Sequence, residues 1–123
     1  MTTQTSLREA IEHAADPVGV MQRVVDHAVG LIEGADGASL EVRREGEVLE
    51  YLCTSGTLEG FIGLQVPIGA SLSGLSLRTG RVERCDDTET DPRVDRAATR
   101  RTGIASMLCM PLQLGDETVA VRK

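Results

Sequence analysis

The sequence has very few aromatic side chains. Among its 123 residues are one tyrosine, one phenylalanine and no tryptophan, so it offers few rings on which nucleic-acid bases could stack. It has no apolar run near the ~20 residues that a membrane-spanning helix needs. Its first residues also lack the basic and apolar regions of a secretory signal. We therefore expect no membrane insertion and a cytoplasmic location.

Positive charge is also scarce. The formal net charge is -6, with 13 basic against 19 acidic residues, and an acidic surface repels phosphate backbones. Nucleic acid is therefore not expected as a partner. The three cysteines are an odd number and lie far apart, at Cys53, Cys85 and Cys109. This pattern indicates reduced thiols that pack inside the domain, and it argues against a disulfide framework. Reduced thiols are typical of a cytoplasmic protein.

The first third of the chain predicts an amphipathic helix. Ser6 and Glu9 have the spacing of a capping box, and Asp16-Pro17 interrupts or restarts the helix. Apolar residues then recur at helical spacing, with Gly34 as a C-cap. The members of this stripe are Val18, Met21, Val25, Ala28 and Ile32.

The pattern changes to that of strands near Ala35. Ranges 35–44 and 47–55 predict a hairpin turned at Glu45-Gly46, with Ser39, Glu41 and Arg43 on a wet face. Later segments follow in order: an extended piece within 56–69, a helix over 71–79 ended by Gly80, a strand over 81–85, a helix from Asp91-Pro92 to Gly103, and strands over 104–114 and 118–121.

This order of elements predicts the fold class. Strands joined by hairpins favour an antiparallel sheet, and the leading helix must bury its apolar stripe on one face. The short helices and loops inserted between strands would cover the other face. We therefore expect an α+β fold that forms one domain over 1–123.

Four sequence stretches resemble GAF domains, in particular those fused to bacterial cyclic-di-GMP enzymes and histidine kinases. They occur in the family's order and spacing, after a helix, at 35–39, 74–80, 86–93 and 106–112. The resemblance implies a GAF-like antiparallel sheet and a sensory role. The family continues after a strand like 118–123 with a long C-terminal helix, so we expect this domain to be truncated at its C-terminal end.

The resemblance also implies where a small molecule would bind. In the family the pocket lies on the sheet face away from the terminal helices, which gives a set of candidate lining residues. Two arginines of this set would meet an anionic group. The full set is Leu75, Arg84, Cys85, Asp87, Arg93, Val94, Met107 and Cys109. The alternative is that these residues fill a closed core and that the arginines point to water.

No metal site and no bound cofactor are expected from the sequence. The acidic run from Asp86 to Asp95 lacks the glycine and glutamate of an EF-hand loop, and Asp91 is assigned to a helix cap instead. Both histidines, His13 and His27, lie in the leading helix region, away from the pocket of the resemblance, so haem ligation and bilin attachment are not expected. The identity of any ligand stays open.

Three functions remain at this point. The first is a sensory module that binds a small molecule or dimerises, and so controls an attached output domain. The second is a ligand-free dimerisation scaffold. The third is a thiol-dependent free methionine sulfoxide reductase, although acidic neighbours are expected to raise the pKa of Cys85. We expect a homodimer with Val18, Met21, Val25 or their neighbours at the contact, and no catalytic residue in the chain.

Overall fold

A computed structural model describes residues 16–31, 34–114 and 117–122. The predicted capping box at Ser6 lies outside this range. The elements occur in the order α2 (Pro17–Leu31), β1 (Gly37–Arg44), β2 (Val48–Gly56), β3 (Gln65–Pro67), the 3-10 helix η1 (Ile68–Ala70), α3 (Leu72–Thr79), β4 (Glu83–Cys85), α4 (Arg96–Thr102), β5 (Met107–Leu114) and β6 (Glu117–Arg122).

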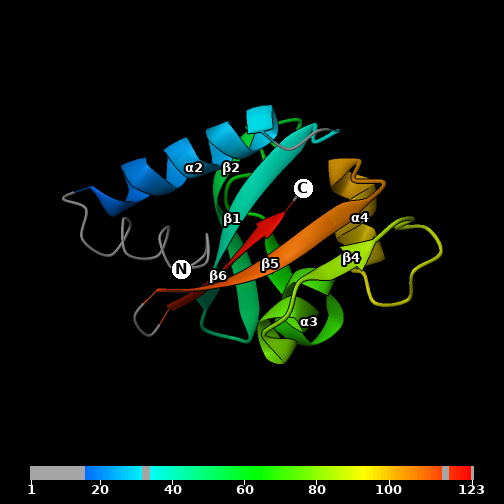
Figure 1. The fold of residues 1–123 in the computed structure, drawn as a ribbon. Helices are drawn as coiled ribbons and strands as arrows, with labels where there is room; N and C mark the ends of the chain where they lie inside the picture. Colours follow the sequence, from blue (N-terminus) through cyan, green and yellow to red (C-terminus); the bar gives the residue numbers. More distant parts are fainter. Residues whose placement is uncertain (1–15, 32–33, 115–116, 123) are drawn as a thin grey trace.

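The strands form one antiparallel sheet, which confirms the predicted fold class. Their order is β3-β2-β1-β6-β5-β4, so β1 and β6 lie side by side at its centre although they are far apart in sequence. Figure 1 shows α2 along one face, with α3 and α4 packed elsewhere on the sheet. The edges are the two short strands β3 and β4.

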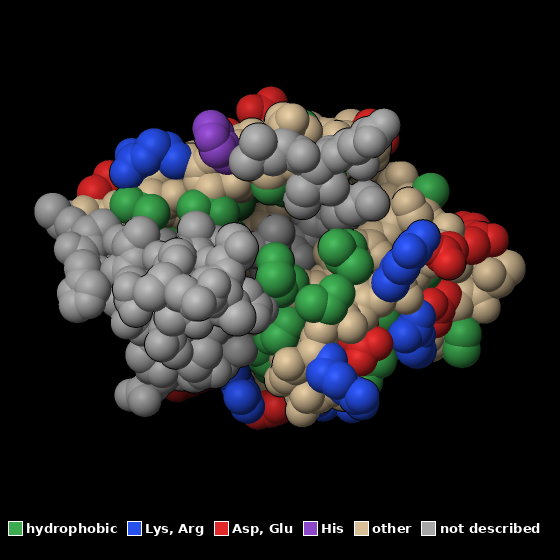
Figure 2. All heavy atoms as spheres, in the orientation of Figure 1, with side chains coloured by type: hydrophobic (Ala, Val, Ile, Leu, Met, Phe, Trp, Pro, Cys, Tyr) green, Lys and Arg blue, Asp and Glu red, His purple; other side chains and the backbone are tan. Residues whose placement is uncertain are grey.

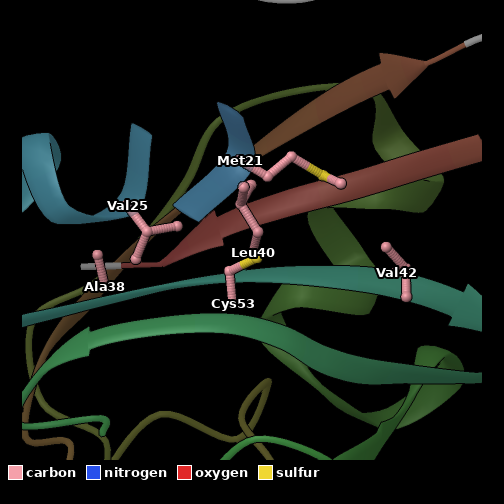
Figure 3. Close-up of a cluster of buried hydrophobic side chains, with 6 residues drawn as sticks. All are labelled: Met21, Val25, Ala38, Leu40, Val42 and Cys53. Atoms are coloured by element: carbon pink, nitrogen blue, oxygen red, sulfur yellow. The ribbon is translucent and has the colours of Figure 1, made fainter. Parts of the chain in front are cut away.

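The apolar stripe of α2 is buried against β1 and β2. Met21 and Val25 pack with Leu40 and Cys53, as Figure 3 shows. Burying a side chain of this size contributes ~1.5–3 kcal/mol. The helix begins after Asp16, whose carboxylate accepts a hydrogen bond from the Gly19 amide at 3.1 Å, so the predicted start is confirmed.

The opposite face of the sheet is also covered, and here one prediction is wrong. Ser39 and Glu41 were assigned to a wet face of β1, but both are fully buried. Successive residues of a strand point to opposite faces. Leu40 therefore faces α2, while Glu41 faces α3, where Ser73 donates to its carboxylate. Residues of β1 do alternate between the two faces of the sheet, as predicted, but the inserted helices cover the second face and bury its side chains.

Helix α3 has the predicted position and end. The hydroxyl of Ser71 accepts from the Gly74 amide at 3.1 Å, and Gly80 closes the helix in the left-handed conformation. Gly74 is required for a packing reason, because a Cβ there would overlap the carbonyl of Ile68 in η1. The helix therefore sits directly on η1.

Helix α4 begins later than predicted. Its N-cap is Asp95, whose carboxylate accepts from the Ala98 amide at 3.2 Å, and it ends at Gly103 as expected. The predicted N-cap Asp91 instead accepts from the amide and guanidinium of Arg93. Because residues 91–94 form a turn held by Arg93, the carboxylate of Asp91 is not available to cap the helix.

Strand bounds differ slightly from the sequence prediction. The first hairpin turns over three residues, with Gly46 and Glu47 both at positive φ, so β2 begins at Val48. The range 104–106 is not strand, and β5 begins at Met107. In the part of the chain that the structure describes, no helix has the length and hydrophobicity to cross a membrane.

Candidate functional site

An apolar cluster lies between the sheet and α3. Along β4 and β5, the register pairs Cys85 with Met107 and Glu83 with Cys109, so these side chains share one face. Leu75 of α3 and Ile104 pack against the cluster from its rim. Its buried members are Leu72, Cys85, Val94, Met107 and Cys109, which are at most 9% exposed.

A buried polar group adjoins this cluster. The Glu41 carboxylate in the central strand β1 accepts from the hydroxyl of Ser73 at 3.2 Å and from that of Ser39 at 3.5 Å. The Ser73 hydroxyl also lies 3.7 Å from the Cys109 sulfur. Ser73 therefore joins the polar group to the apolar cluster, and we call the two together the α3 site.

Neither Glu41 nor Ser73 was predicted from the sequence as a site residue. The signal for Glu41 was present in the predicted fold itself. If inserted helices cover the second face of the sheet, then alternate residues of a central strand must be buried on both faces. Ser73 had no comparable local signal, because its role depends on a contact with a residue 32 positions away.

Residues 86–95, between β4 and α4, lie over one side of the cluster, and we call them the lid. Only Thr88 and Val94 of these ten side chains are buried. The Thr88 amide donates to the Ala105 carbonyl at 2.9 Å, and its hydroxyl donates to the Ile104 carbonyl at 2.8 Å. Glu89 accepts two hydrogen bonds from Arg100 of α4.

Arg93 connects the lid to the edge strand β4 through an ion pair and a hydrogen bond. Its guanidinium pairs with Asp91 at 2.6 Å, reaches Glu83 at 3.4 Å and donates to the Arg84 carbonyl at 2.7 Å. This pairing with Arg93 holds the pKa of the Asp91 carboxyl well below its usual range.

The predicted lining residues are therefore not all brought together. Leu75, Cys85, Val94, Met107 and Cys109 meet in the cluster. Arg84 points to the other face of the sheet from Cys85, because neighbours in a strand alternate, and it forms an exposed ion pair with Asp86 at 2.7 Å. Asp87 is exposed and accepts from the Glu89 amide. Arg93 lies in the lid and is bound to protein groups.

The three cysteines are buried, and they form no disulfide with one another. Burial raises the pKa of the Cys85 thiol, and the Asp91 carboxylate raises it further. The pKa of Cys85 is raised, as expected from the sequence, and the acidic neighbour that contributes to this shift is Asp91. Burial likewise raises the pKa of Cys53. A nucleophilic thiolate needs the opposite shift, so neither thiol has the environment of a catalytic cysteine.

Two recesses open near these elements. One, of about 200 Å³, is lined by Cys85 and Met107 at the end of the cluster and by residues 84, 86, 106 and 108. The other, of about 120 Å³, lies between Gly37 and the loop at 103–106. Within the described ranges, no three or more histidine, cysteine, aspartate or glutamate residues are grouped as metal ligands.

The residues expected at a dimer contact are also separated. Met21 and Val25 are buried in the protomer's own core, 7% and 0% exposed, whereas Val18 is 52% exposed. His27 is exposed on α2, away from the α3 site. Of the three named contact residues, only Val18 is available to a second molecule.

Comparison with sequence families matches the chain to a GAF domain model. The model described as "GAF_2: GAF domain" matches residues 14–121. That span includes every described element from α2 to the larger part of β6. Comparison with curated proteins gave no match.

Solved structures show the same fold. The GAF domain of a phosphoenolpyruvate-protein phosphotransferase from Coxiella burnetii has a TM-score of 0.71 at 16% identity, covering 97% of this chain and 73% of that chain. The GAF-B domain of DevS from Mycobacterium smegmatis has a TM-score of 0.65 at 24% identity, with coverages of 86% and 72%. A free methionine-R-sulfoxide reductase from Neisseria meningitidis has 0.70 at 13% identity, with coverages of 97% and 68%. At these identities the likeness shows the fold alone.

Proposed function

Since the chain belongs to the GAF domain family, a generally sensory and regulatory fold, we propose that it is a cytoplasmic sensor of a small molecule held in the α3 site. Occupancy would bias an attached signalling domain, such as a cyclic-di-GMP enzyme or a histidine kinase. A ligand changes such an equilibrium only through a difference in affinity between two states.

The observation that carries this proposal is the composition of the α3 site. Ligand pockets are mostly apolar with a few fixed polar groups that orient the ligand. Here a carboxylate and two hydroxyls, from Glu41, Ser39 and Ser73, adjoin an apolar cluster that contains Met107 and two thiols. A packed core seldom buries a carboxylate at the centre of a sheet, because its desolvation is costly.

The arrangement also suggests how occupancy would be transmitted. Glu41 is followed in β1 by Val42 and preceded by Leu40, which pack on the opposite face against α2. A ligand that shifts α3 or β1 would therefore change the packing under α2. In this proposal α2 carries the change to a neighbouring domain or to a second protomer.

Mass spectrometry of small molecules released from the purified protein by denaturation tests the proposal. We expect a stoichiometric ligand or, failing that, a thermal shift with a member of a metabolite library. The Glu41→Gln substitution should lower the affinity of the protein for that ligand at least tenfold, which is the scale of one charged hydrogen bond. The matched control is Glu50→Gln, which alters a carboxylate of the sheet that is paired with Arg44 near the surface. The proposal of a sensor would be contradicted if denaturation released no ligand and no compound of the library raised the melting temperature.

A dimerisation scaffold is the second candidate. Besides Val18, the β5 residues Leu108 and Met110 are only partly buried, and they lie on the face opposite Met107 and Cys109. Figure 2 shows hydrophobic side chains gathered over β5 on the face in view. Sedimentation at micromolar concentration should give a homodimer, and Val18→Glu should weaken it. A monomer for the unaltered protein would exclude this candidate.

A further inference from the structure

The lid offers the least costly way into the α3 site. We propose that residues 86–95 open locally to admit the ligand and that Arg93 is the side chain that keeps them closed. The inference rests on the proposed function only in taking the α3 site as the place of binding. The opening itself is a property of the protein without ligand.

Of the two elements that cover the site, α3 is packed more firmly than the lid. Helix α3 buries Leu72, Ser73, Gly74 and Ser76, and Gly74 lies directly against η1. The lid buries only Thr88 and Val94 of its ten side chains. Segments with few buried apolar contacts open locally at a lower free energy than the rest of a domain. The lid therefore opens before α3 does.

The lid is held mainly by polar contacts. Apart from the Thr88 hydrogen bonds and the packing of Val94, these are ion pairs and one hydrogen bond from Arg93 to the Arg84 carbonyl, which are partly or fully exposed and therefore weak. In Figure 2, basic and acidic side chains adjoin one another over the end of the molecule that carries β4 and α4. Contacts of this type form and break without a large change in buried apolar area.

Arg93 links the lid to the sheet more firmly than the other ion pairs do. The pairs from Glu89 reach Arg96 and Arg100 of α4, and Glu89 is 56% exposed, so solvent screens them strongly. Arg93 reaches Glu83 and the Arg84 carbonyl of β4, which belong to the sheet. Arg93 therefore makes an ion pair and a hydrogen bond to the sheet with one side chain, and its partner Glu83 is only 17% exposed.

The chain contains its own reporters for this motion. Cys85 is 1% exposed in β4, and its side chain packs in the cluster with Val94 of the lid. Cys53 is also 1% exposed, but it is packed under α2 on the opposite face. A thiol reagent that enters by lid opening must reach Cys85 without reaching Cys53, whereas global unfolding exposes both.

The experiment measures N-ethylmaleimide labelling of the native, ligand-free protein, with each cysteine quantified by peptide mass spectrometry. Arg93→Met should speed labelling of Cys85 about tenfold, the factor expected for charge-assisted hydrogen bonds, and leave Cys53 unchanged. The control is Arg43→Met, which removes the same charge and an exposed 2.9 Å ion pair to Glu47 in the distant hairpin. It should change neither rate.

A second arm needs no substitution. Raising sodium chloride to about 1 M screens exposed ion pairs, and it should speed labelling of Cys85 relative to Cys53 in the unaltered protein. Equal acceleration of both cysteines by Arg93→Met, or no acceleration of Cys85 in either arm, would overturn the lid. Because these measurements use no ligand, they are decided independently of whether a ligand is ever found.

Discussion

Replacing Gly74 by alanine tests how closely α3 must approach η1. The added Cβ would lie 2.6 Å from the Ile68 Cα and would overlap the Ile68 carbonyl. Alanine in a helix is favoured over glycine by ~1 kcal/mol. Forcing a methyl into a packed contact costs ~1–3 kcal/mol, and more where the neighbour is backbone. Because both partners here are backbone, we take the upper end and expect a net loss of about 2 kcal/mol.

The loss should also have a visible structural origin. To relieve the overlap, α3 must move outward, which withdraws Leu72 and Ser73 from their fully buried positions. Urea unfolding followed by circular dichroism gives the free energy of unfolding. The matched control is Gly69→Ala, where an added Cβ meets no atom within 4 Å and should leave the stability unchanged or slightly raised. A Gly74→Ala protein as stable as the control would refute the close approach.

Three further predictions concern the cap, the lid and the thiols. Asp95→Ala should destabilise the domain by ~1 kcal/mol in urea unfolding, because it removes the N-cap of α4. The pKa of Asp91 is lowered in the folded state, so its contribution is present above its usual pKa of 3.8 and is lost as the pH falls further. The stability difference between the unaltered protein and Arg93→Met should therefore be constant from neutral pH to about 5 and shrink in stronger acid. Titration in denaturant without reductant should recover all three cysteines as free thiols; recovery of one alone would indicate a bridge.

Much of the fold was predictable because its signals are local. The apolar stripe of α2 recurs at helical spacing, and the glycines that end α3 and α4 act within one turn of helix. The antiparallel sheet followed from short connections between alternating segments. The start of α4 was not predictable in this way, since Asp91 and Asp95 both precede it. Which of them caps the helix depends on the side chain of Arg93.

The candidate site was predictable only in part. The family resemblance implied Cys85, Met107 and Cys109 as lining residues, and the structure brings these three together in one cluster. Alternation along β4 places the side chain of Arg84 on the other face of the sheet from that of Cys85, so Arg84 is not part of the cluster. The pairing of Glu41 with Ser73 was not predictable, because it joins residues that only the folded sheet brings together.

The contact between Arg93 and the Arg84 carbonyl has a consequence for the behaviour of the protein in concentrated solution. Strand β4 is an edge of the sheet, and edge strands with open backbone groups can pair with strands of other molecules and start aggregation. The guanidinium occupies one of the backbone acceptors through which a foreign strand would dock. When the lid opens to admit a ligand, it would also expose the edge strand β4, at which aggregation can begin. We therefore expect salt-induced turbidity at high protein concentration to be greater for Arg93→Met than for Arg43→Met.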